Sequence, residues 1–387
     1  MDAHLVHSVF LIFSGAAVLA SVALFTRQPV ILAYIALGIL IGPHGTRWIT
    51  DATLLGQIAE IGIIFLLFLL GLDMQPKALL HVLKQASGVA IGSSLAFWAA
   101  GFGIGVAFGW PVTESVLVGL AVIFSSTIIG IKLLPTTVLH HRHTGELVVG
   151  LLLLQDLIAI VTLIFVAGSG NGDILVTLAR TLVGLPLLAA AALLGVRFAI
   201  LPLLRRFDKY HEYLFLLTIG WCLAMAFLAE YVGLSLEIGA FMGGVSMATT
   251  PVTRYIAESL KPLRDFFLVM FFFTLGAGFN PALLAEVWLP VAALTLVLLL
   301  IKPLVFARLL VWTGERPTDA KEVGMRLGQI SEFSLLLVFL AQSKQLMGDT
   351  AAMLVQATAI AMFAINTYMV ILRYPSPIAI SDALRRD

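Results

Sequence analysis

The sequence consists of apolar segments of membrane-spanning length, joined by connections too short to fold as a soluble domain. A helix needs roughly 20 apolar residues to cross a bilayer, because each residue adds about 1.5 Å to its length. The longest connections have only about ten residues. In agreement, 60% of the residues are hydrophobic and 12% are charged, whereas soluble domains contain roughly 25% charged residues. The chain is therefore predicted to be an all-α polytopic membrane protein.

Thirteen membrane-spanning helices are predicted from these segments. Their approximate limits are residues 6–25, 29–43, 53–72, 84–109, 113–139, 146–168, 174–204, 211–230, 233–249, 255–278, 281–312, 322–343 and 350–373. Twelve helices are the alternative, in case the glycine-rich runs around 233–278 are divided wrongly. Residues 1–387 are interpreted as a single transmembrane domain without a soluble regulatory domain.

The basic residues are distributed asymmetrically between the connections. With the N-terminus outside, 19 of the 23 lysines and arginines fall on the cytoplasmic side. Arg47, Arg180 and Lys344 fall on the opposite side, and Lys302 lies inside a segment. Cytoplasmic loops of membrane proteins carry an excess of positive residues. The pattern favours an odd number of spans, with the N-terminus outside and the C-terminus in the cytoplasm.

A carboxylate, Asp156, lies about ten residues into an otherwise apolar segment, near the predicted middle of the bilayer. Such a group is expensive in lipid and is usually retained to hold a cation or a proton. Gln155 precedes it, and adjacent helical residues point about 100° apart. We therefore expect Asp156 to face a cation directly, while Gln155 supports the site or faces a neighbouring helix. The alternative for Asp156 is a buried ion pair that only holds helices together.

Two further charged residues lie within predicted spans. Lys302 is expected to need either a carboxylate partner, for which Asp156 is the natural candidate, or a lowered pKa. The alternative is that its side chain reaches to the cytoplasmic interface. Glu332 either binds the cation or pairs with Arg326 or Lys132, and a structural charge pair is favoured.

Polar residues interrupt two of the apolar segments. Ser125, Ser126 and Thr127 interrupt the fifth segment, and the run 328–334, which contains Ser331 and Glu332, interrupts the twelfth. Unwound backbone is tolerated in a membrane where it is buried in protein or lines a cavity. Paired breaks at matching places are typical of inverted-repeat transporters, here two sets of five helices. Taken alone, a Ser-Ser-Thr cluster is more often a helix–helix hydrogen-bonding patch, and the paired placement favours a functional role.

Several functional classes are disfavoured. No Walker sequence is present, which argues against an ATP-driven pump. The net charge of +1 gives no indication of a nucleic-acid partner. The single cysteine, Cys222, forms neither an intramolecular disulfide nor a thiolate metal cage. No nucleophile–base pair is visible, so an enzyme is the weakest interpretation, and no cofactor is expected.

Three other motifs are interpreted as structural. The glycines of 101–105 resemble part of a dinucleotide-binding fingerprint, but no predicted strand precedes them, so close helix packing is favoured. The glycines of 239–244 are interpreted in the same way. The run 140–143, with three histidines and an arginine, is interpreted as a solvated basic turn because it lacks a carboxylate or thiolate framework.

Taken together, the segments resemble the monovalent cation:proton antiporter-2 family, and most closely the membrane domain of Kef-type potassium efflux systems. The matching segments are 36–43, 61–72, Phe124–Thr127, Leu154–Asp156, Gly239–Gly244, Phe272–Gly276 and Ser331–Ser334. They extend over nearly the whole chain, and they are specific as a set although each alone is weak.

The resemblance implies a sodium/proton antiporter-like fold of thirteen helices and a homodimer. A mobile core would contain 84–168 and 281–373, with two unwound crossing helices. The dimer scaffold would contain 1–72 and 211–278, and a long helix at 174–204 would link the two. Kef-type proteins usually also carry a cytoplasmic nucleotide-binding domain. Because this sequence contains none, control by nucleotide or glutathione is not carried over, and a regulatory domain or subunit outside this chain stays open.

The resemblance also implies a function. A monovalent cation and a proton would compete for Asp156, supported by Gln155 and the polar breaks, during secondary antiport by alternating access. The Gln155–Asp156 pair looks like the Kef pattern, which favours K⁺ over Na⁺, and Lys302 matches the basic residue of the family on the eleventh span. The expected location is a bacterial inner membrane. Na⁺/H⁺ antiport, a partner-gated potassium channel and a sensor with a silent site are the alternatives.

Overall fold

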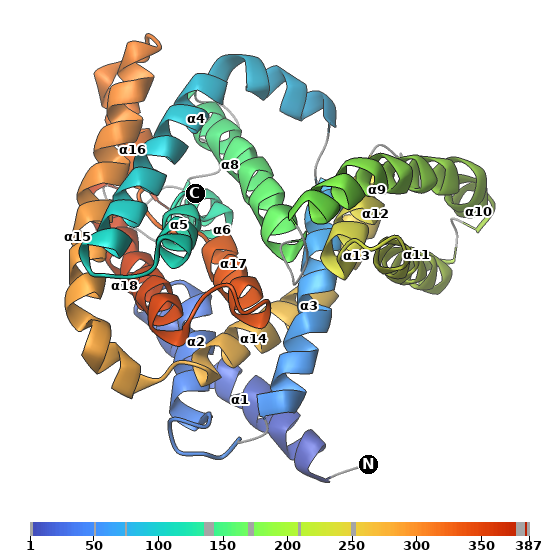
Figure 1. The fold of residues 1–387 in the computed structure, drawn as a ribbon, viewed down its shortest axis with the longest axis horizontal. Coiled ribbons are helices and arrows are strands. Elements are labelled where there is room, and N and C mark those ends of the chain that lie inside the picture. The colour runs from blue at the N-terminus through green and yellow to red at the C-terminus, as the bar shows by residue number, and fades with distance from the viewer. Residues whose placement is uncertain are drawn as a thin grey trace. The chain divides into compact units, whose positions relative to one another are not determined.

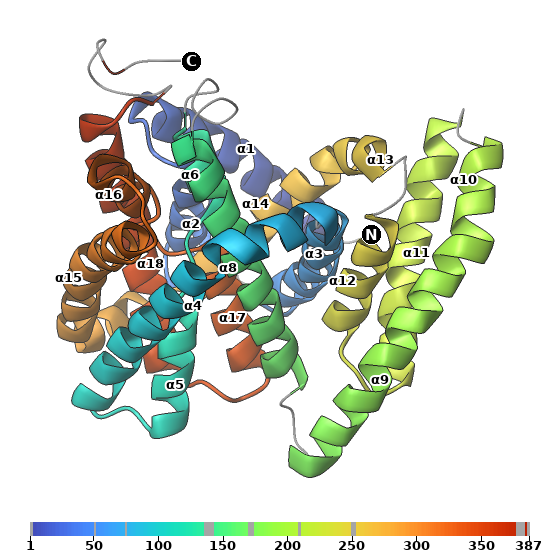
Figure 2. The same ribbon diagram turned by 90° about the horizontal axis from the view of Figure 1, so that it is seen from above.

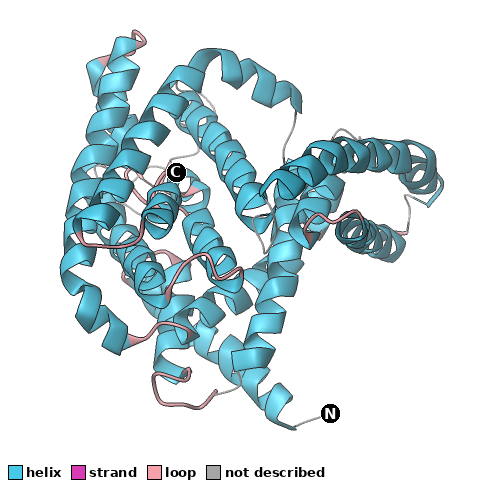
Figure 3. Cartoon of the chain, viewed as in Figure 1, coloured by secondary structure: helices cyan, strands magenta, loops and turns pink. Residues whose placement is uncertain are grey.

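The fold is known from a computed structural model that describes residues 3–49, 52–73, 76–134, 143–168, 174–207, 210–248, 253–376 and 384. These ranges consist of helices and the turns that connect them (Figure 3). Seven helices in the described part are long and apolar enough to cross a membrane. The predictions of an all-α fold and of an integral membrane protein are confirmed.

The chain divides into two compact units that interleave along the sequence. Unit 1 contains Met1–Thr50, Leu80–Thr162 and Leu275–Asp387, and unit 2 contains Asp51–Leu79 and Leu163–Thr274. Helices α4, α8 and α14 each pass from one unit to the other. The residues predicted for the site all belong to unit 1.

The helices that lie wholly or mainly in unit 1 include long apolar helices and shorter ones (Figure 1). They are α1 (Ala3–Phe25), α2 (Val30–Ile41), α4 (Pro76–Ala107), α5 (Val112–Ala121), α6 (Thr127–Lys132), α8 (His143–Gly168), α15 (Pro281–Trp312), α16 (Pro317–Arg326), α17 (Glu332–Ser343) and α18 (Asp349–Arg373). Helix α15 packs against α16 and α18, and α5 packs against α17 and α18 (Figure 2).

The glycines of α4 allow a close approach to α5, as predicted. A methyl group added at Gly101 would collide with Val122 and with the backbone of Gly119, and one at Gly105 would collide with Ser115. Gly103, by contrast, faces open space. Gly101 and Gly105 therefore allow α4 to pack closely against α5, whereas Gly103 does not contribute to this contact.

Unit 2 is built around α12 (Leu236–Met247). Its other helices are α3 (Ala52–Asp73), α9 (Ile174–Gly195), the π-helical turn η1 (Val196–Ile200), α10 (Leu201–Phe207), α11 (His211–Tyr231), α13 (Thr253–Ser259) and α14 (Lys261–Ala277). Helix α12 packs against α3, α9 and α11. A side chain at Gly239 would collide with the Met225 carbonyl, and one at Gly244 with the Phe68 carbonyl, so the predicted packing role of 239–244 is confirmed.

Two segments predicted as interrupted spans are interrupted at the expected places. Helix α5 ends at Ala121 and α6 begins at Thr127, while α16 ends at Arg326 and α17 begins at Glu332. We call residues 122–126 the first break and residues 327–331 the second break. Both breaks lie in unit 1.

Some helix limits differ from those predicted. Helix α4 begins at Pro76 rather than near residue 84. The prediction relied on hydrophobicity, which stops where Lys84 appears. A helix continues into polar sequence when its residues are good helix formers, and proline at the first helical position starts it well. The segment 255–278 consists of α13 and α14, which divide at Leu260.

Candidate functional site

Asp156 lies on α8 and is buried, with 4% of its surface exposed. The Thr127 hydroxyl, at the start of α6, donates to both carboxylate oxygens, at 3.1 Å from Oδ1 and 3.0 Å from Oδ2. Glu332, the first residue of α17, lies close enough for its charge to act on Asp156. The carboxylate therefore lies near the first helical residue that follows each break.

Gln155 points into the first break. Its Oε1 accepts a hydrogen bond of 3.1 Å from the Ser125 amide, and its Nε2 donates to the Ile123 carbonyl at 3.4 Å. The side chain is fully buried. Gln155 thus supports the unwound backbone, while the neighbouring Asp156 faces Thr127.

The two breaks contact each other directly. The Ser125 hydroxyl donates to the Leu327 carbonyl at 2.7 Å, and the Gln329 amide donates to the Ser126 carbonyl at 3.3 Å. These residues are about 200 positions apart in the sequence. The Leu327 carbonyl, which follows the end of α16, is satisfied in this way, whereas the Ser126 carbonyl also accepts a backbone bond of 2.9 Å from the Gly130 amide of α6.

Each break ends in a serine that caps the following helix. The Ser126 hydroxyl accepts a hydrogen bond of 3.1 Å from the Ile129 amide, and the Ser331 hydroxyl accepts one of 3.1 Å from the Phe333 amide. Serine is favoured at this position because its oxygen satisfies one of the free amides of the first turn. The polar residues of the breaks therefore define where α6 and α17 begin.

Lys302 is fully buried on α15, and its partners differ from the predicted one. Its ammonium donates to the carbonyls of Phe124 at 2.8 Å, Val122 at 3.2 Å and Ile123 at 3.4 Å. It also lies 5.0 Å from the centre of the Phe97 ring. The three carbonyls match the three donors of an ammonium group.

The predicted ion pair of Lys302 with Asp156 is therefore wrong. No ion pair joins these two residues, both of which are in the described part of the chain. The alternative, that Lys302 reaches to the interface, is also wrong because the side chain is fully buried. Lys302 binds the unwound backbone of the first break, and the carbonyls of this break take the place of the predicted carboxylate partner.

Arg326, one of the two partners predicted for Glu332, binds other groups instead. The buried Arg326 guanidinium binds Glu322, one turn earlier on α16, at 2.7 Å and 2.9 Å. It also donates to the Leu133 carbonyl at 2.8 Å and to the Pro375 carbonyl at 2.8 Å. The other proposed partner of Glu332, Lys132, has a side chain outside the described part of the structure.

Every residue predicted for the site lies at or beside one of the breaks, within unit 1. They are Ser125, Ser126 and Thr127 at the first break, Ser331 and Glu332 at the second, Gln155 and Asp156 on α8, and Lys302 on α15. All are buried except Thr127, which is partly buried.

Asn366, a polar residue near the second break, was not among the predicted site residues, whereas Gln329 and Ser334 lie within the predicted polar run 328–334. Within the described residues, Gln329 Oε1, Ser334 Oγ and Asn366 Oδ1 are buried oxygens without a hydrogen-bond partner. The Asn366 amide nitrogen donates to the Met325 carbonyl at 3.1 Å, so this side chain of α18 also supports the end of α16. The side-chain amide of Asn366 in an otherwise mostly apolar helix could have indicated its role, but it was not considered.

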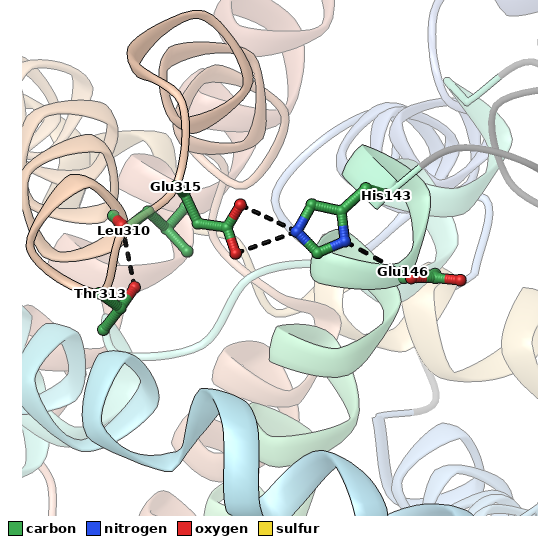
Figure 4. A network of polar contacts seen from close by, with 5 residues as sticks. All are labelled: His143, Glu146, Leu310, Thr313 and Glu315. Atoms are coloured by element: carbon green, nitrogen blue, oxygen red, sulfur yellow. Dashed lines mark hydrogen bonds and ion pairs between the residues drawn. The ribbon is translucent and has the colours of Figure 1, made fainter.

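The histidine run at 140–143 gives no metal site in its described part. His143 Nε2 faces Glu315, at 2.8 Å and 3.0 Å from its two oxygens, and Nδ1 lies 3.5 Å from Glu146 (Figure 4). No cluster of three or more metal-binding side chains occurs among the residues that the structure describes. His140 and His141 lie outside these residues.

Comparison with known proteins decides the family. The model of the family described as "Sodium/hydrogen exchanger, transmembrane" matches residues 10–371. The chain belongs to this family. Its match spans both units and includes both breaks.

Named relatives of this exchanger family point to a narrower group. The glutathione-regulated potassium-efflux system protein KefC of Klebsiella pneumoniae is 29% identical over 96% of this chain and 61% of that protein. K(+) efflux antiporter 4 of Arabidopsis thaliana is 28% identical over 92% of this chain and 62% of that protein. The chain thus spans less than two thirds of these relatives. The predicted resemblance to the monovalent cation:proton antiporter-2 family is confirmed.

The fold is also that of a solved member of the exchanger group. The sodium proton antiporter MjNhaP1 of Methanocaldococcus jannaschii superposes with a TM-score of 0.68 over 94% of each chain, at 17% identity. At this identity the likeness establishes the fold alone.

Proposed function

We propose that this exchanger-family chain is a secondary active K⁺/H⁺ antiporter that works by alternating access, with cation and proton competing for Asp156. The observation that carries the proposal is the position of Asp156. It is a buried carboxylate on a long apolar helix, and it lies where two interrupted helices meet. Charged groups in membrane helices mark ion pathways.

In the proposed cycle, Asp156 holds one positive partner at a time. When ionised, its carboxylate binds the cation and accepts the Thr127 hydrogen bond. When protonated, it loses its charge and releases the cation. The core then moves relative to the scaffold, and the site opens to the other side of the membrane.

The partners of Lys302 support electroneutral exchange. Three carbonyls and the face of Phe97 surround its ammonium, and these contacts are strongest when the nitrogen is charged. If Lys302 keeps its proton, one cation is exchanged for one proton without net charge. The measurement is the transport rate in proteoliposomes at different imposed membrane potentials. A strong dependence on potential would contradict this stoichiometry.

The finer architecture is part of the proposal. We propose thirteen spans in inverted five-helix repeats, a core of 84–168 and 281–373, a scaffold of 1–72 and 211–278, and a linker at 174–204. The protein would form a homodimer in a bacterial inner membrane, with the N-terminus outside, as the distribution of basic residues supports. Regulation would depend on a domain or subunit outside this chain.

Potassium is the preferred cation in this proposal, and sodium is the alternative. The matched relatives are named for potassium efflux, whereas the family model is described as a sodium/hydrogen exchanger. The Gln155–Asp156 pair supports potassium by its resemblance to the Kef pattern.

The test is proton flux in proteoliposomes loaded with a pH-sensitive dye, with K⁺, Na⁺ and Li⁺ compared across a range of pH. The purified chain should move protons against K⁺, and Asp156→Asn should reduce this flux to that of empty liposomes. The matched control is Glu286→Gln, which removes an exposed carboxylate on α15 and should leave the flux unchanged.

Two outcomes would contradict the proposal. Exchange retained by Asp156→Asn would show that another group carries the ions. Single-channel conductance steps without proton counterflow would favour a channel. A larger flux with Na⁺ than with K⁺ would instead change the cation and keep the mechanism.

A further inference from the structure

A hollow of about 500 Å³ lies where α15, α16 and α18 approach one another in unit 1. Three basic side chains line it, namely Arg308, Lys321 and Arg373, and all three are exposed. None of them forms an ion pair with an acidic residue in the described part of the chain. The hollow therefore presents three uncompensated positive charges to its contents.

The remaining lining of the hollow is mostly apolar. It comprises Pro303, Leu304, Ala307, Val311, Pro317, Met325 and the ring of Tyr374. A soluble anion would gain little from such walls, because apolar surface binds apolar groups. Charges and apolar walls together fit an amphipathic ligand with a negative head.

An apolar row on α15 leads to the hollow. Leu296, Leu300 and Leu304 are 60%, 56% and 60% exposed. They are spaced four residues apart, so they lie along one face of the helix, and Arg308 continues the same row. The helix rises about 18 Å between Leu296 and Arg308, compared with about 15 Å for the hydrocarbon of one leaflet.

The position of the hollow fits the level of lipid head groups. Helix α15 ends at Trp312, which is 78% exposed, and tryptophan is enriched at membrane interfaces. Arg373 is the last residue of α18, and Tyr374 follows it. Arginine binds phosphate through two parallel hydrogen bonds, so Arg308 and Arg373 suit the phosphate of a lipid head group.

We propose that this hollow binds the phosphate of an anionic phospholipid. Its head group would lie between Arg308, Lys321 and Arg373, and an acyl chain would follow Leu304, Leu300 and Leu296 along α15. Basic pockets between membrane helices are known to select anionic head groups. A zwitterionic lipid binds more weakly, because its own amine faces the three cations.

Lipid in the hollow would contact residues next to those that hold the breaks. Pro303 follows Lys302, and Met325 precedes Arg326 and accepts the Asn366 hydrogen bond. A methyl group at Gly324 would collide with the Pro303 carbonyl, so α16 packs tightly on α15 at this point. Occupancy therefore stabilises the packing of α15, α16 and α18 around the second break.

The experiment measures lipid binding to the purified chain in detergent and needs no transport. Native mass spectrometry gives the affinity for palmitoyl-oleoyl phosphatidylglycerol and for the matching phosphatidylcholine, and thermal unfolding gives the shift of the midpoint with each lipid. Phosphatidylglycerol should bind more tightly and raise the midpoint more. The triple variant Arg308→Gln, Lys321→Gln, Arg373→Gln should bind it about 100-fold more weakly, at about fivefold for each cation.

Matched controls separate this site from general attraction. Arg316→Gln removes an exposed cation from the α15–α16 connection, outside the lining, and should leave the affinity unchanged. Leu300→Ser with Leu304→Ser should weaken phosphatidylglycerol binding while the charges remain. Should the triple variant fold poorly, Arg308→Gln alone should still show its fivefold loss.

Three results would overturn the proposal. The first is equal phosphatidylglycerol binding by the triple variant and the unmodified chain. The second is equal binding of the two lipids, which would mean that the cations only complement the helix ends. The third is a midpoint shift with inorganic phosphate that matches the shift with phosphatidylglycerol, which would identify a site for a soluble anion.

Discussion

The two breaks share a plan but are held by different chemistry. In each, a serine caps the next helix, Ser126 for α6 and Ser331 for α17. The residue that follows is the neutral Thr127 in the first break and the acidic Glu332 in the second. The first break is fixed by a buried cation, Lys302, which binds three of its carbonyls.

Neutral hydrogen bonds hold the second break. The Leu327 carbonyl accepts from Ser125, and the Met325 carbonyl just before it accepts from Asn366. Buried oxygens of Gln329 and Ser334 have no hydrogen-bond partner in the described structure. The carbonyls of Val122, Ile123 and Phe124 in the first break are therefore occupied, whereas the second break retains side-chain oxygens for further contacts.

The largest effect on stability is expected when the ammonium group of Lys302, which holds the first break, is removed. Lys302→Met leaves the buried Val122 and Phe124 carbonyls without a donor, and the Ile123 carbonyl keeps only its bond from Gln155. Breaking a buried charged contact costs about 3–5 kcal/mol. The matched change in the second break, Asn366→Leu, removes one neutral hydrogen bond and should cost about 1–2 kcal/mol. The measurement is the thermal unfolding midpoint of both variants in detergent. Equal shifts would mean that the breaks do not differ as described.

A smaller effect is expected from the two buried glutamines. Gln155 uses both ends of its amide in the first break, whereas Gln329 uses only its nitrogen. Gln155→Leu should therefore cost about 2–3 kcal/mol, and Gln329→Leu about 1 kcal/mol. Thermal unfolding of the two variants tests the order. The opposite order would show that the oxygen of Gln329 has a partner in the folded protein.

These contrasts also show what the sequence could predict. The breaks, the site carboxylate and the glycine contacts were predicted because polar or glycine residues stand out in apolar helices. The partners of Lys302 were not, because backbone carbonyls freed by a break have no signature of their own. Arg326 and Glu322 are four residues apart on one helix, a spacing that brings side chains together. This spacing predicts their contact better than a pairing with Glu332, which lies on another helix.

The two capping serines should contribute nearly the same stability. The difference between the breaks should therefore come from the residues around the caps. Ser126→Ala and Ser331→Ala each remove one cap, and such a loss typically costs about 1 kcal/mol. Replacement of either serine by threonine should restore most of the stability, because the threonine hydroxyl also caps and adds no charge at these buried positions. The midpoints of the four variants provide the measurement. A much larger loss for Ser126→Ala would mean that this hydroxyl acts beyond capping.

The smallest effect is expected for a polar contact away from both breaks. His143 and Glu315 form an exposed pair between the start of α8 and the end of the α15 region (Figure 4). Exposed ion pairs contribute about 0.2–1 kcal/mol and are screened by salt, because water solvates both partners. Glu315→Gln should thus lower the unfolding midpoint only slightly, and less at high salt. A loss as large as that of Gln155→Leu would show that polar contacts stabilise unit 1 irrespective of burial, and the contrast between the breaks would lose its physical basis.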